Sequence, residues 1–340
     1  MQQRVWVVET PGGPFREMET ARLVPGPGEV LVRIAASGVN PLDTKIRAGK
    51  AAHAKQPLPA VLGLDMAGTV EDVGAGVIGF RPGDEVFGMV GGVGGRQGTL
   101  AELVSADARL LARKPDALSM RECAVLSLSV ITAWEGLVDH AQVGAGQKVL
   151  IHAGAGGVGH MAVQIARAFG ADVFATVSAG KKHLVEAWGA TPIDYQSSTV
   201  EEYVRTSTGG VGFDIVYDTV GGSTLDASFE AVRRYSGRVL SCLGWSTHSL
   251  APLSFRAATY SGVFTLLPLL SGEGMAHHGE ILARTAALAE ESQLRPLLNP
   301  ARFSTTDIDA AYTAVESGST GKVVVDICDS HERAASPIVF

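Results

Sequence analysis

One stretch, residues 148–177, constrains the fold of this chain more than any other. An apolar run, KVLIHA, leads directly into Gly154, Gly156 and Gly159, which have the spacing G-x-G-x-x-G. Apolar residues then recur at helical spacing as far as Phe169, and a second apolar run, DVFATV, follows. In such a unit, backbone N–H groups and a helix N-terminus hold a pyrophosphate. The sequence therefore predicts a dinucleotide site, and its cofactor-binding turn comprises Gly154, Ala155, Gly156, Gly157, Val158 and Gly159.

A second glycine run, at residues 91–94, repeats the letters GGVG of residues 156–159. No apolar residues at helical spacing follow it, so the frame of a phosphate-binding turn is missing. We interpret the segment 88–98 as a mobile surface loop between strands. The alternative is a lid over the substrate.

The residues after the second strand favour one cofactor. A site for NAD usually carries Asp or Glu there, about 20 residues beyond the glycines, to accept the ribose hydroxyls. Here DVFATV runs into Ser178, Ala179, Gly180, Lys181 and Lys182. A hydroxyl and ammonium groups suit a 2′-phosphate, which a carboxylate would repel. We therefore expect NADPH rather than NADH, with Ser178 in the site; the alternative is that both lysines only solvate the start of a helix.

The pattern of apolar residues changes near residue 124. Up to residue 104, alternating or apolar runs between Gly and Pro turns predict a mostly β region. Beyond residue 124, apolar runs alternate with helical segments at 158–169, 181–188, 199–207 and 226–232, which predicts an α/β fold with a parallel sheet and helices on both faces. Past residue 262 we expect a helix at 279–290 and short strands at 300–304 and 321–327, and this tail rejoins the first domain because it is too short to fold alone.

Composition excludes several classes of protein. The 340 residues carry a net charge of −7 with no dense Lys/Arg cluster, so we expect neither a nucleic acid nor a membrane surface as partner. The longest apolar run, 123–138, is broken by polar residues and is shorter than the roughly 20 residues a bilayer needs, so we interpret it as a buried helix. Without a secretion signal at its start, we expect a cytoplasmic protein. Three scattered cysteines, Cys123, Cys242 and Cys328, provide neither a disulfide framework nor a zinc lobe.

The run GQKVLIHAGAGGVG at 146–159, with Gln164 and Arg167 downstream, resembles the signature of the quinone oxidoreductase and zeta-crystallin branch of the medium-chain dehydrogenase/reductase superfamily. Counterparts of SGVNPLDTKIRAG, LGLDMAGTVEDVG, RPGDEVFG, TAWEGL, FDIVYDTVGG and GKVVV occur in the same order. The resemblance implies a Rossmann doubly wound parallel sheet at 125–262. A mostly β GroES-like catalytic domain would comprise residues 1–124, completed by 263–340. It also implies a homodimer or homotetramer joined partly through the edge of the Rossmann sheet.

The same resemblance assigns individual residues. It places Lys182 at the 2′-phosphate, Tyr195 near the adenosine and Thr132 beside the nicotinamide. Independently of it, the segments with Val220 and Gly244 follow expected parallel strands, and ligands of doubly wound sheets lie beyond the carboxyl ends of the strands. We take these two residues as further cofactor contacts.

Zinc alcohol dehydrogenases of this superfamily hold a catalytic metal at positions that match Asn40, Leu64 and about Leu128 here. Leucine cannot ligate zinc and a neutral amide is a poor ligand, so we expect no zinc. Without a Lewis acid, alcohol oxidation is poorly served. NADPH can give hydride directly to a quinone or to the β-carbon of an enone, where the charge that develops on oxygen needs only donors and a proton.

Asn40 and Lys45 are the candidate donors, in the run NPLDTKIRAG. Quinone reductases of the superfamily usually carry tyrosine where this chain has Lys45, and Asn-Pro-x-Asp-x-Lys is instead similar to a run in its alkenal and enone reductases. Alternatively, Asn40 only forms a turn and Lys45 is a solvated helix residue. Asp43 is expected to be structural, either capping the turn or pairing with Lys45.

Three functional hypotheses result. The leading one is a zinc-independent NADPH oxidoreductase that reduces quinones or α,β-unsaturated carbonyls by direct hydride transfer. The second is an alcohol dehydrogenase-like or enoyl-thioester reductase with the same cofactor. The third is a crystallin-like protein that binds NADPH without turnover.

Overall fold

The computed structural model describes residues 2–327, which form two compact units. Unit 1 is drawn from Met1–Leu128, Leu266–Ala286 and Leu297–Phe340, and unit 2 from Ser129–Thr265 and Ala287–Pro296. Both parts of the chain that flank unit 2 thus contribute to unit 1, whereas residues 287–296, inside the predicted segment 263–340, group with unit 2. Cys328 lies outside the described residues.

Unit 2 is an α/β unit. Its strands are β9 (Lys148–Ile151), β10 (Asp172–Val177), β11 (Thr191–Asp194), β12 (Ile215–Asp218), β13 (Arg238–Ser241) and β14 (Thr259–Gly262). Its helices are α3 (Ser127–Trp134, which begins in unit 1), α4 (Gly159–Ala168), α5 (Lys182–Ala187), α6 (Val200–Thr208), α7 (Ser223–Ala231) and α8 (Ala251–Ser254). Short helical turns are η3 (Glu135–His140) and η4 (Ala179–Lys181).

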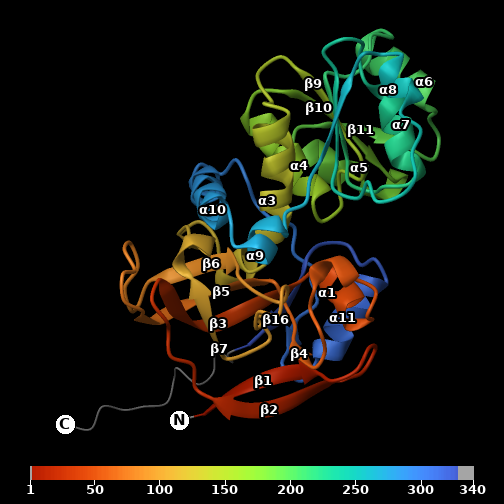
Figure 1. Ribbon diagram of the computed structural model, residues 1–340. Helices are drawn as coiled ribbons and strands as arrows, with labels where there is room; N and C mark the ends of the chain where they lie inside the picture. The colour runs from red at the N-terminus through yellow and green to blue at the C-terminus, as the bar shows by residue number, and fades with distance from the viewer. Residues whose placement is uncertain (1, 328–340) are drawn as a thin grey trace. The chain divides into compact units, whose positions relative to one another are not determined.

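The strands of unit 2 form one parallel sheet in the order β11-β10-β9-β12-β13-β14. This is the 3-2-1-4-5-6 order of a doubly wound dinucleotide-binding sheet. Helix α4 lies on one side of the sheet, and α6 and α7 lie on the other (Figure 1). Aromatic residues of the core, Tyr203, Phe213 and Phe229, are buried between the sheet and these last two helices. Because the strand order reverses between β9 and β12, a crevice is expected at their carboxyl ends.

Helix α6 begins and ends where local chemistry dictates. Thr199 caps α6, because its hydroxyl accepts the N–H of Glu202 while the Glu202 side chain accepts the N–H of Thr199. The helix ends at Gly209, whose φ of 64° is the left-handed conformation that glycine adopts without strain. The sequence predicted this helix at 199–207, one residue from its observed bounds at both ends.

Unit 1 is mostly β. Its strands are β1 (Gln2–Val8), β2 (Phe15–Ala21), β3 (Glu29–Val39), β4 (Ala60–Val61), β5 (Asp65–Val73), β6 (Glu85–Met89), β7 (Leu103–Asp107), β8 (Leu111–Arg113), β15 (Phe303–Ser304) and β16 (Val323–Asp326). Its helices are α1 (Pro41–Arg47), α2 (Met120–Cys123), α9 (Leu267–Ser271), α10 (Met275–Glu290, which ends in unit 2) and α11 (Ile308–Glu316), with turns η1 (Ala52–Ala54) and η2 (Ala108–Leu110).

A seven-stranded sheet, β15-β16-β3-β5-β6-β8 with β7 also on β3, forms the body of unit 1, and β2-β1-β4 form a smaller sheet. Strand β16 runs antiparallel to β3, with Val323 opposite Val39. This pairing explains how the C-terminal segment joins the N-terminal one. It also brings Lys322, just before β16, beside Asn40, just after β3.

Two predictions about local structure are corrected. The run 123–138, predicted as one buried helix, is buried at 123–127, 129–134 and 136–137 but divides into the end of α2, a turn, α3 and η3. The backbone of Ala124 in that turn lies against β3, where a Cβ on Gly38 would come within 2.2 Å of the Ala124 oxygen. Helix α11 was not predicted, and α10 begins four residues before the predicted residue 279.

The glycine loop at 91–98, predicted as a surface loop, is partly buried, with Gly94 and Gly95 exposed. Residues 91–93 are buried, and a Cβ on Gly91 would lie 1.9 Å from the Gln97 carbonyl oxygen. The amides of Gly94 and Gly95 donate to Ala54 O at 2.9 Å and to Gln56 Oε1 at 2.8 Å. These contacts hold the loop against the segment after α1.

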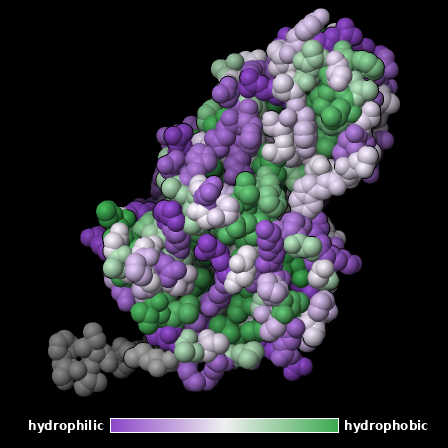
Figure 2. Space-filling view, in the orientation of Figure 1, coloured by the Kyte–Doolittle hydropathy of each residue, from purple (hydrophilic) through white to green (hydrophobic). Residues whose placement is uncertain are grey.

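Hydrophilic and hydrophobic residues are interspersed over the visible faces of both units (Figure 2). Among residues 2–327 we find no helix with the length and apolar character that a membrane crossing requires.

Candidate functional site

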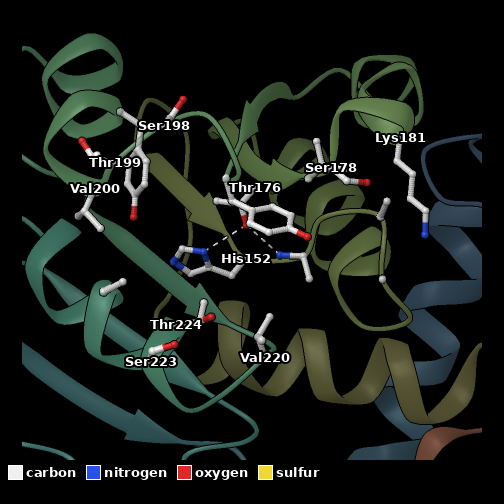
Figure 3. Close-up of a pocket in the computed structure, with 17 residues that line it drawn as sticks. His152, Thr176, Ser178, Lys181, Ser198, Thr199, Val200, Val220, Ser223 and Thr224 are labelled. Carbon is white, nitrogen blue, oxygen red and sulfur yellow. Dashed lines mark hydrogen bonds between the residues drawn. The ribbon is translucent and has the colours of Figure 1, made fainter. Parts of the chain in front are cut away.

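A cavity of about 760 Å³ opens at the carboxyl ends of the strands of unit 2, where the strand order reverses (Figure 3). The turn after β9, the end of β10, the segment after β11 and the turn after β12 line it. The lining residues include His152, Ala153, Ala155, Gly156, Thr176, Ser178, Lys181, Tyr195, Thr199, Val200, Tyr203, Val220, Thr224 and Ala227. The position is the one at which doubly wound sheets bind their ligands.

The glycines of the turn after β9 are required by close packing. A Cβ on Gly159, the first residue of α4, would lie 2.1 Å from the Ala153 carbonyl oxygen, and one on Gly154 would lie 2.5 Å from Ala175 Cβ of β10. Gly156 is less tightly enclosed, with 3.0 Å to the same Ala153 oxygen, and it lines the cavity. The first and third glycines thus seat helix and turn on the sheet, and the second leaves room for a ligand.

The structure brings five predicted cofactor residues to the cavity wall: Ala155, Gly156, Ser178, Tyr195 and Val220. Gly154, Gly157, Val158 and Gly159 belong to the same turn without lining the cavity. Gly244 follows β13 and packs against β14, where its Cβ would lie 2.3 Å from the Tyr260 hydroxyl.

The two lysines after β10 differ in their surroundings. Lys181 lines the cavity, whereas Lys182, to which the resemblance assigned the 2′-phosphate, is not among the lining residues. Lys182 Nζ instead lies 3.3 Å from Asp194 Oδ2. The register of the sheet explains this pair, because Val177 at the end of β10 is opposite Asp194 at the end of β11. Sequence reasoning missed this distinction, which depends on strand register.

His152, which the sequence analysis did not select, lies inside the cavity wall. Its ring is buried, and Nδ1 lies 3.2 Å from Thr176 Oγ1. The same hydroxyl accepts the N–H of Ala153 at 3.0 Å, and Thr219 Oγ1 donates to the His152 carbonyl at 2.7 Å. Burial lowers the pKa of His152 to about 4, against the opposing charge of Asp218, so the imidazole is neutral at physiological pH.

Asp218, at the end of β12, shapes the turn that presents Val220. Its Oδ1 accepts the N–H groups of Val220 and Gly221, each at 3.0 Å, and its Oδ2 accepts the Ser241 hydroxyl at 2.7 Å. Gly221 has φ of 83°, and a Cβ there would meet the Leu243 oxygen at 2.6 Å. The Asp218 carboxylate therefore fixes the backbone of the turn that contains Val220.

Thr132, a predicted catalytic residue, is buried in α3 and does not line the cavity. Its carbonyl accepts the Tyr217 hydroxyl at 2.6 Å, and its Oγ1 lies 3.0 Å from Thr265 Oγ1. The Thr265 hydroxyl also lies 2.7 Å from Glu135 Oε2. Thr132 is thus part of a hydrogen-bonded group within unit 2.

The other two predicted catalytic residues lie in unit 1, and only Asn40 is buried. The backbone N–H of Asn40 donates to Asp43 Oδ2 at 2.8 Å, which caps α1. Its side-chain Nδ2 donates to Asp65 Oδ2 at 3.0 Å, while Lys322 Nζ donates to its Oδ1. Asp65 Oδ1 accepts the Leu128 N–H at 3.0 Å. We call Asn40, Asp43, Asp65 and Lys322 the buried polar cluster.

Lys45 stands apart from this cluster, exposed on α1. Of the two roles expected for Asp43, the structure shows the capping one. Lys45 lies close enough to His53 for its charge to reinforce burial in lowering the pKa of that imidazole. Sequence reasoning missed Asp65 and Lys322 as partners of Asn40, although both belong to motifs it had quoted, LGLD and GKVVV.

Comparison with known proteins identifies the family of this chain. Residues 26–116 match the model described as alcohol dehydrogenase GroES-like domain, and residues 157–267 match the one described as zinc-binding dehydrogenase. A 2-methylene-furan-3-one reductase of Solanum lycopersicum is 35% identical over 306 residues, 87% of this chain and 71% of that protein. The chain belongs to the medium-chain dehydrogenase/reductase superfamily. A chloroplastic NADPH-dependent alkenal/one oxidoreductase of Arabidopsis thaliana is 32% identical, over 95% of this chain and 79% of that member.

Solved structures of the superfamily agree. An alcohol dehydrogenase superfamily protein from Novosphingobium aromaticivorans has TM-score 0.94 and 56% identity, covering 96% of this chain and all of that one (100%). A quinone oxidoreductase from Coxiella burnetii (TM-score 0.81, 26% identity, covering 96% and 100%) supports the quinone oxidoreductase-like branch. The CurK enoyl reductase has TM-score 0.83 and 27% identity, with the same coverage of 96% and 100%. By contrast, the chain spans only 14% of a spectinabilin polyketide synthase system protein of Streptomyces orinoci, at 36% identity.

The zinc ligands of this superfamily do not fit the residues present. Leu64 is a fully buried hydrocarbon, Leu128 offers a backbone N–H to Asp65, and the Asn40 oxygen accepts from Lys322. Among residues 2–327 no group of three or more His, Cys, Asp or Glu side chains is arranged to hold a metal ion.

One ammonium faces two carboxylates in the buried polar cluster, and all three groups are shielded from water. Burial raises the pKa of Asp43 to about 8 and that of Asp65 to about 6, with Lys322 opposing both shifts. Burial also lowers the pKa of Lys322, against the attraction of the carboxylates. The cluster therefore retains a proton on Asp43 at neutral pH.

This proton makes stability depend on pH. Because the folded-state pKa of Asp43 is raised, its contribution to the free energy of unfolding is complete below pH 3.8 and is lost as the pH rises to about 8. We expect Asp43→Asn, which keeps an acceptor for the Asn40 N–H and cannot ionise, to gain stability relative to the wild type by about 1 kcal/mol per pH unit between pH 5 and 7. Urea unfolding of both proteins across this range measures the difference. Asp72→Asn, an exposed control in unit 1, should show no such trend. If the free energy of unfolding of Asp43→Asn instead changes with pH in the same way as that of the wild type, the raised pKa of Asp43 is contradicted.

Proposed function

We propose that the protein is a zinc-independent, NADPH-dependent reductase of α,β-unsaturated carbonyls or quinones that works by direct hydride transfer. The cavity of unit 2 is the observation that supports NADPH as the cofactor. Ser178 and Lys181 line it at the end of β10, while the carboxylate of Asp194 is paired with Lys182. Enones lead among the acceptors, because two relatives are named as furanone and alkenal/one reductases. The run N-P-x-D-x-K at 40–45 is consistent with this class.

The residues of the cavity fit a dinucleotide phosphate. The turn with Gly156 would hold the pyrophosphate beside the first turn of α4, and Ser178 and Lys181 would hold the 2′-phosphate. When bound, NADPH supplies the hydride. Lys45, an exposed ammonium, would stabilise the negative charge on the acceptor oxygen, while Lys322 and Asp65 fix the amide of Asn40.

The assignment of the 2′-phosphate is testable by one pair of variants. We expect Lys181→Ala to raise the KM for NADPH by roughly 10- to 100-fold, the cost of one charge-assisted hydrogen bond, with little change for NADH. Lys182→Ala should have a much smaller effect, because Lys182 pairs with Asp194. Steady-state kinetics with both cofactors measures the ratio. A larger effect for Lys182→Ala would contradict our assignment and restore the one that the resemblance implied.

The proposed reaction is tested by NADPH oxidation with a panel of enones, quinones, aldehydes and enoyl thioesters. We expect enones to give the highest kcat/KM, and Lys45→Ala to lower it for enones while the affinity for NADPH is kept. Similarity to the CurK enoyl reductase favours enoyl thioesters as the second candidate. NADPH binding with turnover of none of the acceptors would refute the enzyme and favour the crystallin-like alternative.

We also propose a homodimer formed through the edge of the unit 2 sheet. Strand β14 is the last in the strand order, and exposed apolar side chains lie before it, within it and after it: Trp245, Leu250, Phe255, Tyr260 and Phe264. An unpaired strand edge beside apolar side chains suits pairing with a second copy. Light scattering at micromolar concentration that shows only monomers would refute the dimer.

A further inference from the structure

His152 carries a buried hydrogen-bonding atom that the proposed function has not used. The imidazole is 3% exposed and belongs to the turn after β9. Within residues 2–327 its Nε2 is buried and meets no hydrogen-bond partner. In Figure 3 the ring lies among the lining residues of the cavity, with Thr176, Val200 and Thr224 around it. Buried polar atoms without a partner are rare in folded proteins, so this one calls for an explanation.

The hydrogen bonds around Thr176 determine where the proton of this imidazole lies. Thr176 Oγ1 accepts the N–H of Ala153 at 3.0 Å, and an amide can only donate. A hydroxyl oxygen can accept twice, but within residues 2–327 the acceptor in reach of the Thr176 hydroxyl hydrogen is His152 Nδ1, at 3.2 Å, so we assign the hydroxyl as the donor of this bond. Because a neutral imidazole carries one proton, accepting at Nδ1 places that proton on Nε2. Nε2 is therefore an N–H donor within the cavity wall.

The surroundings of this donor indicate which half of a dinucleotide it would meet. Val200, Tyr203 and Ala227 offer an apolar and aromatic surface on the α6 and α7 side of the cavity, which suits a flat base. The phosphate-binding features lie elsewhere on the wall, at Gly156 and at Lys181. A purine base presents ring nitrogens that accept hydrogen bonds, and an N–H donor complements them.

We propose that the Nε2–H of His152 donates to a ring nitrogen of the adenine base of the bound dinucleotide, so that His152 is a positioning residue for the adenosine half of the cofactor. This inference rests on the proposed NADPH function and adds to it a recognition contact for the base. It also explains the unpartnered donor, since the ligand supplies the acceptor that the protein does not.

The test uses a ligand that contains only the adenosine half. By isothermal titration calorimetry we expect His152→Leu, which fills the space without a donor, to bind adenosine 2′,5′-bisphosphate about tenfold more weakly than the wild type. His152→Gln, which keeps an N–H donor, should retain most of the affinity. His140→Leu, at an exposed histidine of the same unit, is the matched control and should bind like the wild type.

Affinity per folded molecule separates a contact with the ligand from a packing role. His152→Leu removes the unpartnered Nε2–H but also the acceptor of the Thr176 hydroxyl, so its effects on the Tm of the unliganded protein oppose each other. A purely structural role for His152 predicts a lower Tm with unchanged affinity per folded molecule, whereas the proposed contact predicts weaker binding by the molecules that are folded. Reduced nicotinamide mononucleotide, which lacks the adenosine half, should support turnover equally in the wild type and in His152→Leu.

Two kinds of failure are distinguishable. If the wild type binds the bisphosphate and His152→Leu binds it equally well, the contact with His152 is refuted and the proposed function stands. If the wild type binds neither the bisphosphate nor NADPH, the proposed function itself fails and the contact fails with it.

Discussion

Replacing Lys322 by methionine is expected to lower the free energy of unfolding by about 3–5 kcal/mol at pH 8. The side chain of Lys322 is almost fully buried, and its ammonium is the positive charge that faces Asp65 and Asp43 and donates to Asn40. Methionine fills a similar volume but leaves the carboxylates without compensation, and the cost of an uncompensated buried charge exceeds that of the lost contacts. Chemical denaturation followed by far-UV circular dichroism measures the loss.

The pH dependence of this loss separates charge from packing. At pH 5, Asp43 and Asp65 are already protonated to a large extent, because burial raises the pKa values of both, so the loss should be smaller than at pH 8. Lys45→Met, at an exposed lysine of the same unit, should change stability by no more than about 0.5 kcal/mol. If Lys322→Met lowers the free energy of unfolding equally at the two pH values, packing rather than charge explains the effect.

Substituting Gly159 by alanine is expected to weaken NADPH binding by at least about 100-fold, or to prevent unit 2 from folding. The added Cβ would lie 2.1 Å from the carbonyl oxygen and 2.8 Å from the carbonyl carbon of Ala153, both backbone atoms. The turn after β9 would have to move away from α4, which would displace the amides that, in the proposed function, hold the pyrophosphate. Calorimetric titration with NADPH and a thermal melt together distinguish the two outcomes.

Gly144→Ala provides the matched control for this substitution. Gly144 lies in the same unit, outside the cavity wall, and no heavy atom outside its chain neighbours lies within 4 Å of an added Cβ. We expect it to bind NADPH with wild-type affinity. Equal affinities for Gly159→Ala and Gly144→Ala would contradict the role we assign to close packing at the glycine turn.

The parts of the fold that local chemistry determines could be predicted from the sequence. The six residues DVFATV form β10 with the predicted bounds, and Thr199 with Glu202 starts α6 where a capping box predicts it. The glycine turn was also predictable, because its spacing and flanking periodicity are local. Helix α11 was missed because its apolar positions follow a polar segment without a start signal that we recognised.

The contacts that distinguish residues within the site depend on tertiary pairing and could not be predicted. Lys322 reaches Asn40 across 282 residues, only because β16 pairs with β3. Lys181 and Lys182 are adjacent in sequence, yet the β10–β11 register gives Asp194 to the second of them. The same letters GGVG end in different environments, since residues 91–93 pack against neighbouring backbone and residues 156–159 open α4.

Deuterium labelling is the most direct test of the proposed hydride transfer from NADPH to the β-carbon of an enone. The protein is incubated with NADPH that carries deuterium at both C4 positions and with an α,β-unsaturated ketone, and the product is analysed by mass spectrometry and NMR. Our account predicts a saturated ketone with one deuterium at the former β-carbon. An allylic alcohol with deuterium at the former carbonyl carbon would contradict it, as would an absence of NADPH consumption with every enone tried.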